Sequence, residues 1–145
     1  MAVVRDLPNR KGTNIVSVAP TSTVLEAARL MNDRSVGGVL VVDDAGALLG
    51  IFTERDILRR VVAASLPPET TKVADVFTRD VVTTSPDTTI DECGAIMSSR
   101  RVRHLPVVDA NGLHGVVTIG DLLAQRVSEH ETTIQHLNSY VFDMR

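Results

Sequence analysis

The chain has 145 residues, of which 43% are hydrophobic and 3% aromatic, and its formal net charge is −3 at pH 7. This composition predicts a packed globular protein and excludes the disordered class. Few aromatic residues and an acidic balance argue against stacking on nucleic acid and against binding to anionic membranes.

Cys93 is the single cysteine, which excludes an intrachain disulfide and a cysteine metal cluster. The N-terminal residues lack the apolar core of a signal peptide, and the sequence has no apolar run long enough to span a bilayer. We therefore expect a cytoplasmic protein in a reducing compartment, with neither nucleic acid nor a membrane as its partner.

The first half of the chain predicts a strand, a helix, a hairpin and a second helix. A strand is expected over residues 15–18, and residues 23–26 (Thr-Val-Leu-Glu) have the pattern of a capping box that starts a helix. Two β-rich runs around an Asp-Asp-Ala-Gly turn predict a hairpin over 39–52. The second helix is expected to begin at Thr53.

The second half repeats this order after a proline-containing break at 66–71. A strand is expected over 81–84, a capping box at 89–92 and a hairpin over 105–117. The sequence therefore predicts an α/β (α+β) protein made of two pseudo-symmetric β-α-β-β-α units packed through their sheets. We expect the first unit in residues 1–65, the second in 66–127 and a helical tail in 128–145.

The tail carries an apolar stripe without a counterpart after the first half. Val127, Ile134 and Val141 recur every seven residues, which predicts a helix that packs on the module or on a second subunit. Together with the two-sided apolar character of the other helices, this stripe leads us to expect a homodimer.

Each half places Thr-x-x-Asp between an apolar strand and a helix, first at Thr53–Asp56 and again at Thr118–Asp121. Such a pair can cap the helix, because the hydroxyl accepts from a free N–H and the carboxylate complements the positive helix end. It can also hold a nucleotide, with the hydroxyl and helix start facing phosphate and the carboxylate accepting from ribose. Its occurrence at matched places in a duplicated unit favours ligand binding.

With these elements, the chain resembles a pair of cystathionine-β-synthase (CBS) domains, or Bateman module, over roughly residues 1–127. The resemblance rests on both Thr-x-x-Asp elements, on the strand exits at 17–20 (Ser-Val-Ala-Pro) and 83–86 (Thr-Thr-Ser-Pro), and on 101–109. It implies two clefts between the units and ligands such as AMP, ADP, ATP, NAD or S-adenosylmethionine. Residues 134–140 also look like the tail of small stand-alone bacterial CBS-pair proteins.

The resemblance also implies which positions hold the nucleotide. Apolar strand residues and their backbone would hold adenine, the aspartates would hold ribose, and the threonines would face phosphate with help from Arg55 or Arg103. The first half offers Ile15, Ser17, Gly37, Gly38, Val39, Thr53, Arg55 and Asp56, and the second offers Val81, Thr83, Arg103, His104, Leu105, Pro106, Thr118, Gly120 and Asp121.

The two sites are expected to differ in charge. Arg103-His104 stands where the first half has Gly37-Gly38, and Gly120 stands where the first half has Arg55. Because arginine can contact phosphate in a bidentate way, we expect the site of the second half to depend on Arg103 and that of the first half on Arg55.

Three classes of function are open from the sequence. The duplicated motif favours a regulatory module that senses a nucleotide and signals through a protein partner. A structural dimerisation protein would use both aspartates as caps alone, and His104 could be a plain surface histidine. For an enzyme, the sequence lacks a Ser-His-Asp order, a glycine-rich phosphate loop, metal-ligand spacing or a paired-carboxylate motif. Catalytic residues, a catalytic cofactor and a bound metal are therefore not predicted.

Overall fold

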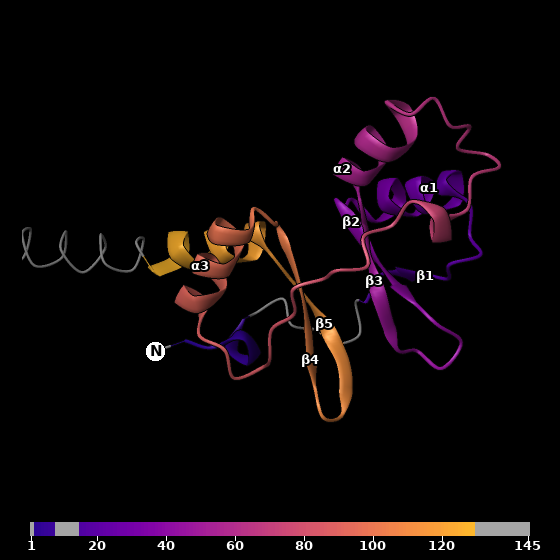
Figure 1. The fold of residues 1–145 in the computed structure, drawn as a ribbon. Helices are drawn as coiled ribbons and strands as arrows, with labels where there is room; N and C mark the ends of the chain where they lie inside the picture. Colours follow the sequence, from indigo (N-terminus) through magenta and orange to yellow (C-terminus); the bar gives the residue numbers. More distant parts are fainter. Residues whose placement is uncertain (1, 8–14, 130–145) are drawn as a thin grey trace, which may run out of the picture.

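The computed structural model of the chain describes residues 2–7 and 15–129, which form two lobes side by side (Figure 1). The first lobe holds a three-stranded sheet in the order β1-β2-β3, in which β1 runs parallel and β3 antiparallel to β2. Its elements are β1 (Ser17–Val18), α1 (Val24–Arg34), β2 (Gly38–Val42), β3 (Leu48–Thr53), α2 (Glu54–Asp56), the π-helical η2 (Ile57–Val62) and the 3-10 turn η3 (Val73–Asp75).

The second lobe repeats the helix and hairpin of the first. Its two-stranded sheet pairs β4 with β5 antiparallel, and His104 lies opposite Thr118 in the register. Its elements are α3 (Ile90–Arg100), β4 (His104–Asp109), β5 (Gly112–Thr118), a helix whose described part is 119–129, and the 3-10 turn η1 (Val4–Asp6) near the N-terminus. The mixture of helices and small sheets confirms the predicted α+β class.

Local sequence signals explain both long helices. Thr23 begins α1 by accepting a hydrogen bond from the Glu26 N–H, and Thr89 begins α3 by accepting from the Glu92 N–H. Both predicted helix starts are confirmed. Each helix ends in a left-handed residue other than glycine, Ser35 after α1 (φ 54°) and Arg101 after α3 (φ 56°).

Both predicted first strands are shorter than expected. The predicted strand 15–18 is reduced to β1, and the predicted strand 81–84 is reduced to a single parallel bridge between Thr84 and Val107. The second strand is interrupted because the Val81 N–H donates to the Arg79 carbonyl and turns the chain before it reaches β4. These turned residues become part of a cleft described below.

The segment before each repeat packs on the opposite lobe. Val4 and Leu7 are buried in the core of the second lobe, and residues 73–77 supply Val73, Val76 and Phe77 to the core of the first. Equivalent hydrogen bonds fix both segments, from the Val4 N–H to the Thr88 carbonyl (2.9 Å) and from the Val73 N–H to the Ser22 carbonyl (2.8 Å). The predicted boundary at 65/66 stays a prediction, but the two cores do not follow it.

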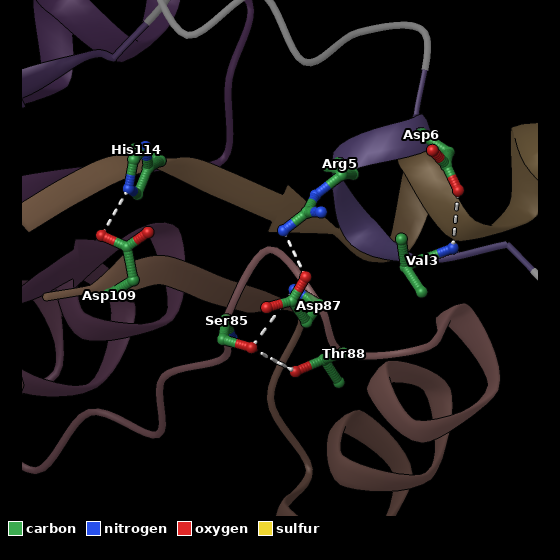
Figure 2. A network of polar contacts seen from close by, with 8 residues as sticks. All are labelled: Val3, Arg5, Asp6, Ser85, Asp87, Thr88, Asp109 and His114. Atoms are coloured by element: carbon green, nitrogen blue, oxygen red, sulfur yellow. Dashed lines mark hydrogen bonds and ion pairs between the residues drawn. The ribbon is translucent and has the colours of Figure 1, made fainter. Parts of the chain in front are cut away.

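Polar contacts reinforce the N-terminal attachment (Figure 2). Arg5 pairs with Asp87, and the Val3 N–H donates to the Asp6 carboxylate across η1. Beyond this attachment, His114 of β5 donates to Asp109 across the hairpin at 2.7 Å, which lowers the pKa of the Asp109 carboxyl. The predicted tail stripe beyond residue 129 lies outside the described residues. Among the described helices, none is both long and apolar enough to cross a membrane.

Candidate functional site

Two clefts lie between the lobes, and each takes its walls from both halves of the chain. The first cleft encloses ≈ 180 Å³ and the second ≈ 290 Å³. The first cleft sets Thr53, Arg55 and Asp56 against Val81, Arg103 and His104. The second cleft sets Thr118, Asp121 and His104 against Val16, Gly37 and Gly38.

The carboxylate of Asp56 is held on both of its oxygens in the wall of the first cleft. The Thr53 N–H donates to Oδ2 at 3.0 Å, and the Thr78 hydroxyl donates to Oδ1 at 2.9 Å. Arg60 Nε lies 3.6 Å from Oδ1. Asp56 is buried, with 6% of its surface exposed. The Thr53 hydroxyl also donates to Oδ2 at 3.4 Å. Because a carboxylate offers about four lone-pair positions, Asp56 has room for about one further hydrogen bond while it caps α2.

Thr118 and Asp121 form the same reciprocal cap at the second cleft. The Thr118 N–H donates to Asp121 Oδ2 at 2.9 Å, and the Asp121 N–H donates to Thr118 Oγ1 at 3.2 Å. The capping interpretation of both motifs is therefore confirmed. Because both motifs also line a cleft, capping and ligand contact are compatible.

His104 forms a wall shared by both clefts and lies close to Gly38 opposite it. It lies at the start of β4 and lines both clefts. A Cβ at Gly38 would lie 3.3 Å from the His104 Nε2 and 3.1 Å from the Thr53 Cγ2. Gly38 and His104 are equivalent positions of the repeat, so a second side chain there would be tightly packed against the first.

The surroundings of His104 favour its neutral form. Burial lowers the pKa of the imidazole, and the Arg103 charge acts in the same direction, while the carboxylates of Glu54 and Asp121 oppose the shift. Neutral imidazole offers one donor and one acceptor, so His104 can serve both clefts with hydrogen bonds and without adding charge.

The arginines of the two predicted sites lie together. Arg55 and Arg103 both line the first cleft, and none of the described residues that line the second is an arginine. Arg55 Nη1 donates to the Arg101 carbonyl at 3.3 Å, so its side chain crosses to the other lobe. Because each Thr-x-x-Asp faces the opposite half, Arg103 lines the cleft of the Thr53 motif. The dependence of each site on one arginine stays a prediction.

Some predicted positions lie behind the cleft walls. The side chains of Val39 and Leu105 belong to the two cores, so these positions would meet a ligand through their backbone. Their binding role stays a prediction, as it does for the other predicted positions that line neither cleft: Ile15, Ser17, Thr83, Pro106 and Gly120.

Sequence reasoning missed several lining residues, of which Thr78 and Arg101 matter most. Thr78 lies in the segment between the repeats and pairs with Ile51 at the edge of β3. A signal for this approach was present, since Gly50 interrupts an apolar strand and strand glycines mark close backbone approach. A Cβ at Gly50 would lie 2.2 Å from the Thr78 carbonyl oxygen.

Comparison with known proteins decides the family. The model of the CBS domain matches residues 4–63 and 73–128. The chain belongs to the CBS-domain family. Its two lobes are therefore tandem CBS units, as the resemblance implied, and the clefts lie between the two units of a CBS pair.

Relatives of this CBS pair occur in bacteria and plants. The chain is 34% identical to the CBS domain-containing protein YhcV of Bacillus subtilis, over 87% of this chain and 92% of that protein. It is 37% identical to the mitochondrial CBS domain-containing protein CBSX3 of Arabidopsis thaliana over 82% of this chain, but it spans 60% of that protein's length.

Solved structures share the fold closely. A putative signal-transduction protein with CBS domains from Burkholderia ambifaria is 35% identical, with a TM-score of 0.80 over 86% of this chain and 91% of that one. Two structures at 24% identity share the fold: the CBS pair of MJ0100, in complex with 5′-methylthioadenosine and S-adenosyl-L-methionine, and CBSX2, in complex with AMP. Their TM-scores are 0.79 and 0.75, over 89% and 90% of this chain and 98% and 99% of theirs.

Proposed function

We propose that this CBS pair is a regulatory module that binds adenosine nucleotides, such as AMP, ADP, ATP or NAD, in its two clefts and signals through a protein partner. One observation carries the proposal: each Thr-x-x-Asp motif faces a wall from the other CBS unit. A ligand in either cleft would therefore contact both units and stabilise one arrangement of them.

The chemistry of the first cleft suits a nucleotide. Its apolar lining (Ile51, Val81, Val82, Val102) can receive the flat face of a base, and the Asp56 carboxylate can accept from ribose hydroxyls. Arg55 and Arg103 supply charge-assisted donors for phosphate. CBS pairs commonly bind adenosine ligands and are generally regulatory, and the complexes of MJ0100 and CBSX2 hold such compounds.

Isothermal titration with adenosine, AMP, ADP, ATP and NAD tests this function. Binding of at least one compound is expected, and Asp121→Ala should weaken binding at one class of site by about tenfold or more, because ribose loses a charged acceptor. Thr89→Ala is the matched control, because it removes a helix cap of similar cost outside both clefts. If all five compounds fail to bind the folded wild-type chain, the proposed function is wrong.

A second candidate is a structural dimerisation protein without a ligand. It is favoured by the reciprocal caps, which give both aspartates a sufficient role in the fold. This function predicts that Asp121→Ala and Thr89→Ala lower the thermal unfolding temperature by similar amounts and that nucleotides do not raise it.

We also propose that the module forms a homodimer through its two motif-bearing helices. Leu58 and Val62 are 61% and 64% exposed, and the equivalent Leu123 and Val127 of the second lobe are 56% and 53% exposed. Because the two pairs occupy equivalent positions of the repeat, the same helices of a second copy could cover both pairs.

Light scattering should give twice 15.7 kDa for the wild type and a monomer for Leu123→Asp. Leu49→Asp, on β3, is the control. A monomeric wild type at micromolar concentration would contradict the proposal.

A further inference from the structure

Beside the first cleft lies a second hollow whose charged residues are all arginines. This arginine hollow encloses ≈ 510 Å³ and is lined by Arg55, Arg59, Arg101 and Arg103 together with small and apolar residues. In the described part of the chain, no carboxylate is among its lining residues. Arg55, Arg101 and Arg103 also line the first cleft, so the two spaces adjoin each other, whereas Arg59 lines the hollow alone.

The four guanidinium groups lack carboxylate partners in the part of the chain that the structure describes. The ion pairs found there involve Arg5, Arg60 and Arg126, and none includes an arginine of the hollow. The chain as a whole is acidic, with a formal net charge of −3, so this concentration of positive charge is a local feature. Four like charges around one space repel each other and would be relieved by an anion.

The backbone at Arg101 allows its side chain to be removed without strain, although Ser35 ends α1 in the same conformation. Arg101 ends α3 in the left-handed conformation, with φ 56°. Glycine is favoured at this position because other residues pay a steric cost there. An arginine at this place keeps a charge at the junction of cleft and hollow at some expense of stability.

We propose that the first cleft takes an adenosine nucleotide with two or three phosphates, whose terminal phosphates lie in the arginine hollow. This inference rests on the proposed function of the cleft as a nucleotide site. Arginine suits the role because its planar fork matches phosphate oxygens in a bidentate way. Among the described residues that line the second cleft there is no arginine, so we assign the preference for polyphosphate to the first cleft.

Titration of the full chain with AMP, ADP and ATP at one ionic strength tests the proposal. ADP and ATP should bind one class of site about tenfold or more tightly than AMP, because additional charge-assisted hydrogen bonds form in the hollow. Equal affinities for AMP and ATP at both classes of site would overturn the proposal and leave the proposed function standing. Failure of adenosine, AMP, ADP, ATP and NAD alike would remove both.

Two variants separate the hollow from the cleft. Arg59→Ala should lower ATP affinity by about tenfold and leave AMP affinity unchanged, since Arg59 reaches the hollow but not the first cleft. Arg101→Gly should lower ATP affinity, because it removes one charged donor from the hollow. The unfolding temperature should stay the same or rise, because glycine adopts the left-handed conformation without steric cost. A loss of affinity caused by misfolding would lower that temperature instead.

Arg100→Ala is the matched control, because Arg100 is an exposed neighbour in the last turn of α3 that lines neither space. It should keep wild-type affinity for ATP. Equal losses of AMP and ATP affinity in Arg59→Ala would overturn the proposal. So would inorganic tripolyphosphate that binds as tightly as ATP, or a short RNA that binds more tightly and displaces it, because the hollow would then recognise polyanions in general.

Discussion

The two clefts are built from the same motif and differ in what faces it. In the first cleft, Asp56 is buried, is held by Thr78 from the segment between the repeats, and faces a wall with arginines. In the second, Asp121 is half-buried and faces glycines. The duplication therefore supplies the Thr-x-x-Asp motif and its strand and helix twice. The residues that face each motif determine the charge of its cleft and how firmly its aspartate is held.

This difference follows from a few positions of the repeat. Arg103 and His104 occupy the places that Gly37 and Gly38 occupy in the first unit. Because each motif faces the opposite unit, Arg103 lines the cleft of the Thr53 motif and Gly38 lines that of the Thr118 motif, while Gly37 lines both. Substitutions at one of these positions are expected to alter the cleft of the other unit's motif.

Gly50→Ala should have the largest effect on stability, because it disrupts the first cleft and not the second. Its Cβ would lie 2.2 Å from the Thr78 carbonyl oxygen and 2.6 Å from the Phe77 ring. Separating these groups would break the backbone pairing of Ile51 with Thr78, so we expect a loss of about 3 kcal/mol in the free energy of unfolding by urea.

Gly94→Ala is the control for this substitution. On α3 the new Cβ would meet Leu122 at 4.0 Å, and alanine favours a helix, so a gain of about 0.5–1 kcal/mol is expected. If Gly50→Ala were as stable as the wild type, the close approach of Thr78 to β3 would be refuted.

The two motif aspartates should differ in their contribution to stability. Asp56→Ala leaves the Thr53 N–H and the Thr78 hydroxyl without their acceptor in a nearly buried site, so we expect a loss of about 2–3 kcal/mol. Asp121→Ala removes the cap of a more exposed helix start and should cost about 1 kcal/mol. Urea unfolding measures both, and equal losses would show that the burial of Asp56 adds nothing to its role as a cap.

Local signals in the sequence were sufficient to predict the repeat, the starts of the helices and the positions of the two motifs. Thr23, Thr89 and the two Thr-x-x-Asp elements act within three residues of chain, so their patterns predict their hydrogen bonds. The family resemblance added the tandem arrangement, which the comparison confirms. These features depend on short-range geometry that a sequence pattern encodes directly.

The partners across the clefts could not be predicted in the same way. Thr78 bonds to Asp56 over 22 positions, and Arg55 bonds to Arg101 over 46. Val4 enters the core of the second lobe far from its own repeat. Such contacts depend on how the two units dock. Arg103 lies beside the Thr118 motif as expected, because the Ile119 N–H donates to its carbonyl at 2.9 Å, but the sequence did not show that it also lines the cleft of the Thr53 motif.

The wall shared by the two clefts can be tested at Gly38. Gly38→Ala places a Cβ 3.1 Å from the Thr53 Cγ2 and 3.3 Å from the His104 Nε2, so we expect a loss of about 1 kcal/mol in the free energy of unfolding. Part of that loss should disappear in a His104→Ala background, because the imidazole no longer occupies the space. A double-mutant cycle measures this coupling, and strictly additive losses would contradict contact between the two positions.

His104 should also give the module a small dependence of stability on pH. Burial holds the pKa of its imidazole below the ordinary value of 6.5, with Arg103 acting in the same direction and Glu54 and Asp121 opposing. As the pH falls through the unfolded value, the unfolded chain binds the proton first, so stability is lost until the pH passes below the folded pKa. His104→Gln removes this titration and keeps a neutral polar side chain. The decrease in unfolding free energy between about pH 7.5 and about pH 5.5 should therefore be smaller in this variant than in the wild type. An identical decrease in both proteins would mean that the imidazole takes up its proton as easily between the clefts as in the unfolded chain.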